Sequence, residues 1–393
     1  MTIGIIGSGA MGAGIAQVVA VAGHEVSLLD QSVTALEKAA AGIASNLRKL
    51  AEKGKMTTEA ADAAVARLRP TTDMQDFQGC GLVLEAIVEE LAVKQQVFRQ
   101  VEAVVSAECI LASNTSSLSI ASIAAACQRP ERFVGIHFFN PAPLMQLVEV
   151  IPAVQSRAGL AEEIRALVQS WGKLPVLVKD TPGFIVNRVA RPFYGEAIRL
   201  LEEGVADMAT IDWALTELGG FRMGPFALMD FIGHDVNYRV TESVFTAFFF
   251  DPRYKPSFTQ KRLFEAGYYG RKSGRGFYSY APDAVMPEPT RDPKLGQQIL
   301  RRVLAMLINE AVEALALNVA SKEDLELAMT KGVNYPKGLL AWADELGLPQ
   351  VLATLDAMYD EYHEDRYRAS PLLRRMVKAN QSFFAHEPVA GNA

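Results

Sequence analysis

Short apolar runs alternate with longer stretches of helical periodicity over residues 1–182. The runs at 2–6, 25–29, 81–87, 110–113 and 133–138 are typical of buried strands, and 176–178 is expected to close the sheet. Residues 10–22 and 34–69 have helical patterns, the second broken near Gly54 and restarting at Thr57, with Thr58 and Glu59 as capping candidates. This alternation predicts an α/β domain of the Rossmann type, with a parallel sheet covered on both faces and a helical hairpin inserted after the second strand.

The pattern changes at Thr181-Pro182-Gly183 and is helical from there on. The helical part is interrupted by a Pro-rich linker at 281–293. Adding 114 to residue numbers in 188–233 gives matching residues in the later part: Glu196 matches Glu310, Asp230 matches Asp344, and Gly233 matches Gly347. About a quarter of the aligned positions are identical, which indicates a duplicated helical domain. The expected domains are therefore 1–182, 183–285 and 293–386.

A glycine-rich turn follows the first predicted strand and opens the first helix. Its sequence is Gly7-Ser8-Gly9-Ala10-Met11-Gly12. The glycines allow a tight turn, a close approach of the backbone to a pyrophosphate, and close packing of helix and strand. Asp30 ends the next strand and is expected to accept hydrogen bonds from the adenosine ribose. Because this carboxylate repels a 2′-phosphate, the cofactor is expected to be NAD rather than NADP, although the turn alone is also compatible with a flavin.

Composition and charge narrow the partners. The chain has 393 residues and a net charge of −6, which argues against nucleic acid as the main partner. Three cysteines without a CxxC pattern argue against a zinc site and a disulfide framework. No apolar run reaches the length of a membrane span, and the first strand begins at once, which leaves no room for a signal peptide. A cytoplasmic location is therefore expected.

His137 is the strongest candidate for a catalytic base. It lies at the end of a predicted strand, where open α/β sheets place their ligands. Imidazole has a suitable pKa to take a proton from an alcohol, and such a base needs an acceptor that holds its tautomer. Glu149, flanked by apolar residues on another predicted strand, is the candidate acceptor. Ser116 ends a further strand, and Asn187 opens the helical part.

These residues belong to motifs that together resemble the 3-hydroxyacyl-CoA dehydrogenase family over essentially the whole chain. The motifs are Gly7 to Gly12, Ala86-Ile87-Val88-Glu89, Ser113-Asn114-Thr115-Ser116-Ser117, His137-Phe138-Phe139-Asn140-Pro141, and Thr181-Pro182-Gly183-Phe184-Ile185-Val186-Asn187-Arg188. The resemblance implies a Rossmann domain followed by two helical domains that resemble the C-terminal region of 6-phosphogluconate dehydrogenase.

The resemblance also implies roles for individual residues. His137 is the base, paired with Glu149, and Ser116 and Asn187 hydrogen-bond the reacting oxygens of the substrate. The implied NAD site comprises Gly7, Gly9, Met11, Gly12, Asp30, Glu89, Lys94 and Asn140. Lys53 matches a position that contacts coenzyme A, and Asn46 stands where the family has a second, serine contact.

The implied reaction is the oxidation of (3S)-3-hydroxyacyl-CoA to 3-oxoacyl-CoA in fatty-acid or phenylacetate degradation. The helical duplication resembles family members that act on 3-hydroxyadipyl-CoA or 3-hydroxybutyryl-CoA, and a dicarboxylyl substrate would need a cation such as Arg191 or Arg222. Arg301 stands where the second copy would need the equivalent of Asn187, so that copy is expected to be non-catalytic. The expected assembly is a monomer or a homodimer. The alternatives are another β-hydroxyacid dehydrogenase that uses a catalytic lysine, or a non-catalytic NAD-binding relative.

Overall fold

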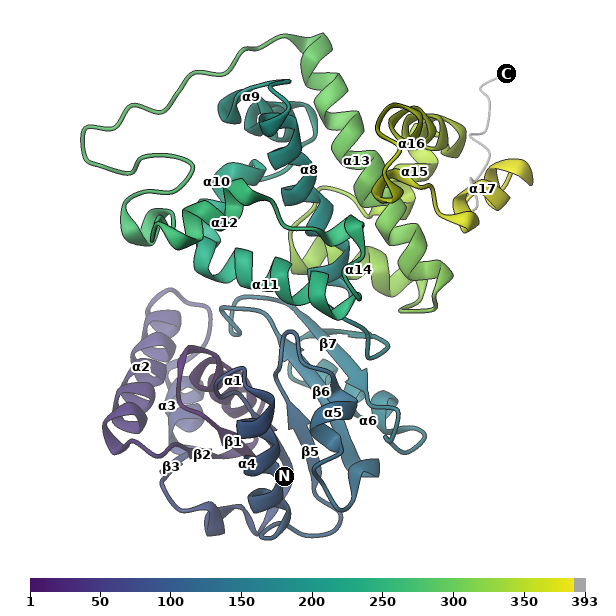
Figure 1. Ribbon diagram of the computed structural model, residues 1–393. Helices are drawn as coiled ribbons and strands as arrows, with labels where there is room; N and C mark the ends of the chain where they lie inside the picture. The colour runs from purple at the N-terminus through teal and green to yellow at the C-terminus, as the bar shows by residue number, and fades with distance from the viewer. Residues whose placement is uncertain (385–393) are drawn as a thin grey trace, which may run out of the picture. The chain divides into compact units, whose positions relative to one another are not determined.

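An eight-stranded sheet forms the centre of the first compact unit, Met1–Phe184, of the computed structural model, which describes residues 1–384 (Figure 1). The strands follow the order β3-β2-β1-β4-β5-β6-β7-β8. Their bounds are β1 Thr2–Ile6, β2 Glu25–Leu29, β3 Leu68–Thr71, β4 Cys80–Glu85, β5 Ile110–Ser113, β6 Phe133–Phe138, β7 Leu147–Pro152 and β8 Leu174–Leu177. All neighbours pair in parallel except β6 and β7.

The helices of this unit pack on the sheet and on one another. They are α1 Ala10–Val21, α2 Val33–Glu52, α3 Thr58–Ala66, α4 Leu91–Glu102, α5 Ile120–Ala124 and α6 Leu160–Ser170. The helices α2 and α3 form the predicted hairpin and pack against α1. Strand residues such as Ile3, Ile5 and Leu84 are fully buried and form the core with the apolar faces of the helices. This burial of both sheet faces explains why most strands are continuous apolar runs.

Three details differ from the sequence prediction. Strand β3 overlaps the end of the stretch 34–69, which was predicted to be helical, and it was missed because this four-residue edge strand contains Arg69 and Pro70 and lacks an apolar run. Strand β7 is antiparallel to β6 because the eight residues 139–146 are too few for a parallel crossover. The N-cap of α3 is Thr57, whose hydroxyl accepts the Ala60 N–H, rather than Thr58 or Glu59.

The second unit begins at Ile185 and is helical. Its helices are α7 Val186–Val189, α8 Arg191–Glu202, α9 Met208–Trp213, α10 Pro225–Ile232, α11 His234–Ala247, α12 Phe258–Glu265, α13 Pro293–Ala316, α14 Lys322–Gly332, α15 Leu339–Leu346, α16 Leu348–Tyr362 and α17 Pro371–Lys378. The long helix α13 runs through this unit and packs along α8 (Figure 1). The expected end of the last domain at residue 386 lies outside the described residues.

The 114-residue repeat is visible as repeated hydrogen bonding. Asp212 accepts the backbone N–H groups of Phe226 and Ala227 at the start of α10. Glu326, which is 114 residues later, accepts those of Leu340 and Ala341 at the start of α15. Each carboxylate thus satisfies two free N–H groups of a helix N-terminus. Both copies therefore use an acidic side chain in the same place for the same structural purpose.

Two buried ion pairs cross between the copies. Arg188 Nε lies 2.6 Å from Glu310 Oε1, and Arg302 Nε lies 2.5 Å from Glu196 Oε1. Under the 114-residue repeat, Arg302 is the equivalent of Arg188, and Glu310 is the equivalent of Glu196. Each copy therefore supplies one arginine and one glutamate to the ion pairs between the copies. This reciprocal arrangement is the pattern of a two-fold interface formed within one chain. The three-domain boundaries at 182, 285 and 293 stay a prediction, since the compact units divide only at residues 184 and 185.

Within residues 1–384, no helix combines the length and the apolar character needed to cross a membrane.

Candidate active site

The glycine-rich turn joins β1 to α1 and can only be built from glycine at two positions. Gly7 has φ of +97°, and a Cβ added there would stand 2.6 Å from the Ala86 carbonyl oxygen. A Cβ on Gly12 would stand 1.8 Å from the Gly7 carbonyl oxygen. At Gly9 a Cβ would meet nothing within 4 Å, so open space lies above the backbone there. Met11 follows in the first turn of α1 and is half-buried.

Asp30 lies at the end of β2 and is held against this turn. Its Oδ2 accepts hydrogen bonds of 2.8 Å from both the backbone N–H and the hydroxyl of Ser8, and its Oδ1 accepts one from the Ser32 N–H. Burial raises the pKa of Asp30, but these hydrogen bonds outweigh that effect and keep its pKa below the ordinary value. The side chain is half-buried, and an ionised carboxylate has capacity for further donors.

The residues present at this turn fit a dinucleotide. The open space over Gly9, the free N–H groups at the start of α1 and the ionised carboxylate at the end of the next strand are the three features that such a site requires. A carboxylate at the end of this strand repels a 2′-phosphate, which favours NAD over NADP.

His137 and Glu149 form a buried pair on adjacent strands. They stand directly opposite each other in the antiparallel register of β6 and β7. His137 Nδ1 lies 2.7 Å from Glu149 Oε2, the His137 side chain is 6% exposed, and that of Glu149 is fully buried. The antiparallel return of β7, which the sequence did not predict, is what brings the two side chains together on one face of the sheet.

Aromatic rings and a neighbouring loop fix the position of the imidazole. The ring of Phe139 lies 4.5 Å from that of His137, and the ring of Phe184 lies 5.8 Å away. Asn114, after β5, accepts the backbone N–H of Phe138 through its side-chain oxygen. The imidazole is thus held by its carboxylate on one side and by apolar rings on another, which limits its rotation.

Glu89 gathers the loop that follows β5. Its Oε1 accepts hydrogen bonds from the Thr115 hydroxyl at 2.6 Å, from the Ser116 N–H at 2.8 Å and from the Ser117 N–H at 3.1 Å. Burial raises the pKa of Glu89, but the Lys94 ammonium and these hydrogen bonds outweigh it, so the pKa lies below its ordinary value. The Glu89 carboxylate thus binds three consecutive residues of the loop that carries Ser116.

Lys94 is part of a buried ionic cluster that includes Glu85, a residue that the sequence analysis missed. Lys94 Nζ lies 2.5 Å from Glu85 Oε1 and 3.3 Å from Glu89 Oε2, and its side chain is 1% exposed. Glu85 also accepts hydrogen bonds from the Ser113 hydroxyl and the Ile87 N–H. The signal for Glu85 was an acidic residue at the end of an otherwise apolar strand, which is costly without a partner.

The remaining predicted residues lie apart from this cluster. Asn140 is exposed beyond the end of β6, in the turn before a cis proline. Asn46 and Lys53 are exposed on and just after α2, in the hairpin beside α1. Asn187 is on α7, in the second unit, and its role toward the substrate stays a prediction. Residues 1–384 contain no group of His, Cys, Asp and Glu side chains that could hold a metal ion.

Comparison with known proteins shows the family to which the chain belongs. Residues 2–181 match the family described as "3-hydroxyacyl-CoA dehydrogenase, NAD binding domain", and residues 183–280 and 299–383 match the C-terminal domain of the same family. The 3-hydroxyadipyl-CoA dehydrogenase of Escherichia coli (strain K12) is 39% identical over 95% of this chain and 97% of its own length. A probable 3-hydroxybutyryl-CoA dehydrogenase of Deinococcus radiodurans is 44% identical over 71% of this chain and 100% of its own.

A solved structure shows the same architecture over almost the full length. The crystal structure of 3-hydroxybutyryl-CoA dehydrogenase from Escherichia coli K12 has a TM-score of 0.91 and 38% identity, covering 96% of this chain and 98% of that one. The chain therefore belongs to the 3-hydroxyacyl-CoA dehydrogenase family and is an NAD-dependent oxidoreductase with a Rossmann-type domain and a helical C-terminal region.

Proposed function

We propose that the chain oxidises (3S)-3-hydroxyacyl-CoA to 3-oxoacyl-CoA with His137 as the general base. The observation that carries this proposal is the 2.7 Å contact between His137 and Glu149, buried at the carboxyl end of a strand in the unit that holds the dinucleotide turn. Bound NAD supplies the hydride acceptor for the hydrogen on C3 of the substrate.

The pair defines which nitrogen of His137 takes the proton. A carboxylate only accepts hydrogen bonds, so Nδ1 carries the proton that faces Glu149, and Nε2 has a lone pair for the 3-hydroxyl proton. As that proton arrives, the ring becomes an imidazolium beside the Glu149 carboxylate, which stabilises the new charge. In the reverse reaction Nε2 returns the proton to the forming alcohol.

Ser116 and Asn187 are proposed to donate hydrogen bonds to the reacting oxygens. The Ser116 hydroxyl lies 3.3 Å from Glu89 Oε1, a longer contact than the Ser116 N–H makes to the same atom. The N–H can therefore hold the loop while the hydroxyl turns toward a substrate oxygen. Glu89, Lys94 and Asn140 are proposed to complete the NAD site.

The coenzyme A moiety is proposed to contact the hairpin of α2 and α3. Lys53 is exposed at the end of α2, near Arg48, Lys49 and Lys55, which are exposed as well. This local positive charge suits phosphates in a chain whose net charge is −6. Asn46 is on the same helix and is proposed as a second, neutral contact.

The acyl group is proposed to be short or to end in a carboxylate. The relatives named for 3-hydroxyadipyl-CoA and 3-hydroxybutyryl-CoA support this range. The reaction is proposed to serve fatty-acid or phenylacetate degradation. The experiment is to measure NADH oxidation with acetoacetyl-CoA, then kcat/KM for 3-hydroxybutyryl-CoA and 3-hydroxyadipyl-CoA with NAD. Turnover of at least one hydroxyacyl-CoA is expected. NADH binding without any turnover would instead identify a non-catalytic relative.

A further inference from the structure

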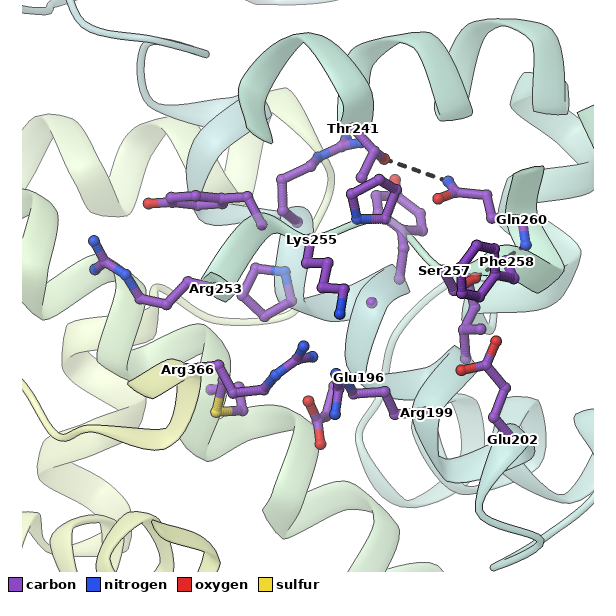
Figure 2. A pocket seen from close by; sticks show the side chains of 18 residues that line it. Glu196, Arg199, Glu202, Thr241, Arg253, Lys255, Ser257, Phe258, Gln260 and Arg366 are labelled. Atoms are coloured by element: carbon purple, nitrogen blue, oxygen red, sulfur yellow. Dashed lines mark hydrogen bonds between the residues drawn. The ribbon is translucent and has the colours of Figure 1, made fainter. Parts of the chain in front are cut away.

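The helical unit contains a cavity of about 170 Å³ with a strong excess of positive charge (Figure 2). It lies among α8, the start of α12 and the segment that joins α11 to α12. Five cations line it, Arg191, Arg199, Arg253, Lys255 and Arg366, against two carboxylates, Glu196 and Glu202. Lys255 and Phe258, both exposed, show that it opens to solvent.

Three of the five cations are neutralised within the protein. Arg253 pairs with Asp251 at 2.8 Å and approaches Glu310 at 3.5 Å. Arg199 and Arg366 both pair with Glu364. These arginines therefore have structural partners.

Arg191 is different, because it is buried without a carboxylate. The residue is 8% exposed, and its Nε has no hydrogen-bond partner among the described residues. Its one side-chain hydrogen bond is a long one, 3.3 Å from Nη1 to the Thr241 hydroxyl, and its guanidinium carbon stands 4.8 Å from the centre of the Tyr194 ring. Burial lowers the pKa of Arg191, and no carboxylate offsets that effect. A buried charge without a partner is costly.

Lys255 adds a second cation without a partner in the described part of the chain. No ion pair or hydrogen bond of its amino group is present there. Figure 2 shows the Lys255 amino group and the Arg366 guanidinium pointing into the same space from opposite sides. The cavity thus offers unused positive charge from its wall and from its opening.

The second helical copy shows that the fold itself does not need this charge. The residue that matches Arg191 under the 114-residue repeat is Ala305, which is 3% exposed, and the one that matches Thr241 is Leu355, which is fully buried. The same place in the second copy is therefore packed with apolar side chains. Arg191 and Thr241 are an addition that only the first copy carries.

We propose that this cavity binds the carboxylate of a short aliphatic acid, with Arg191 as its main contact and Lys255 at its opening. Guanidinium matches a carboxylate with two parallel hydrogen bonds, and the free Nε is one of the donors for that fork. Apolar lining from Pro192, Ile198 and Met306 suits the methylene chain. Since a cavity of about 150 Å³ holds benzene, an acid of about four to six carbons is the appropriate size.

The carboxylate has two sources that experiment can separate. It is either the far end of a dicarboxylyl acyl group, which rests on the proposed function, or a free dicarboxylic acid that binds on its own. Both require the same cations, so the same variants test both.

The first test is calorimetric titration of adipate and glutarate into the full chain saturated with NADH. We expect binding to wild type, and a loss in Arg191→Met of about tenfold to a hundredfold, the range for charge-assisted hydrogen bonds. Lys255→Met changes an exposed residue that should not affect folding, and it should weaken binding by about threefold, as expected for a partly screened charge. Arg375→Met, at an exposed arginine on α17 outside the cavity, is the matched control and should leave binding unchanged.

The second test compares kcat/KM for 3-hydroxyadipyl-CoA and 3-hydroxybutyryl-CoA in the same variants. If the acyl group supplies the carboxylate, Arg191→Met and Lys255→Met lower only the adipyl value. If a free acid is the ligand, both values stay unchanged while the titration of adipate or glutarate is lost. The proposal is overturned if wild type binds neither acid and both kcat/KM values are unaffected in both variants, or if binding survives both substitutions. Because the titration needs no turnover, it also stands if the proposed dehydrogenase activity fails.

Discussion

Replacing Glu149 by Gln isolates the electrostatic role of the buried carboxylate beside His137. The change keeps the shape of the side chain and an oxygen that can face Nδ1, but it removes the negative charge. Glu149 is fully buried, and the contact between its Oε2 and His137 Nδ1 is 2.7 Å long, so solvent screens the lost interaction very little.

The expected loss follows from when the charge develops. Hydrogen bonds to charged groups contribute about 1.5–3 kcal/mol, against about 1 kcal/mol for neutral ones. The imidazolium forms only as the substrate proton is transferred, so the difference of about 0.5–2 kcal/mol appears in the transition state and lowers kcat by about twofold to thirtyfold. If the Gln amide nitrogen turned toward Nδ1 it would also favour the wrong tautomer, and the loss would approach about 10⁴-fold.

The assay is steady-state NADH oxidation with acetoacetyl-CoA, together with the Kd for NADH from its fluorescence. Glu162→Gln, at an exposed position on α6 of the same unit, is the matched control and should behave as wild type. The reasoning is refuted if Glu149→Gln has the same kcat as wild type, or if the Kd for NADH rises as much as kcat falls.

Three further predictions concern stability, cofactor choice and the repeat. Glu310→Gln should destabilise the helical unit by about 3–5 kcal/mol in urea unfolding, because it leaves the buried Arg188, 1% exposed, without a carboxylate. Glu196→Gln should destabilise the unit less, because Arg302 keeps its ion pair with Glu203. Asp30→Asn should narrow the preference for NAD over NADP by about tenfold, measured as the ratio of kcat/KM values, because the repulsion of a 2′-phosphate is lost. Deleting 293–393 should cause aggregation or dimerisation in light scattering, because it exposes the apolar face against which α13 packs.

Each has an outcome that would contradict it. If Glu310→Gln and Glu196→Gln lowered the free energy of unfolding equally, the second carboxylate beside Arg302 would not compensate for the loss of Glu196. An unchanged cofactor ratio would remove Asp30 from the ribose site. A truncated chain that stays a soluble monomer would show that the second copy does not replace a partner subunit.

The parts of the site that the sequence predicted are those that local geometry determines. The turn from Gly7 to Gly12 requires glycine for steric reasons. A carboxylate at the end of the strand after such a turn commonly binds the adenosine ribose of a dinucleotide, so both features could be predicted without the structure. The His137–Glu149 pair was predicted because a buried acid on a strand needs a partner. Its exact register, set by the antiparallel return of β7, depends on the eight-residue connection and was not foreseen.

The rest depends on contacts between distant segments. The partner of Glu85 became visible only in the structure, where α4 places Lys94 against the end of β4. The repeat placed matching Arg and Glu residues in both helical copies, yet only the structure shows that they pair across the copies. The lack of a carboxylate beside Arg191 is likewise visible only in the folded unit. The sequence alone offered both Arg191 and Arg222 as cations for a substrate carboxylate.

The most direct test of the proposed mechanism is the turnover of acetoacetyl-CoA with NADH by His137→Gln, measured beside wild type with the Kd for NADH of each. A general base contributes about 10²–10⁴-fold, so we expect kcat to fall by that factor while the Kd for NADH stays the same. Near-normal turnover by His137→Gln would contradict the assignment of His137 as the base.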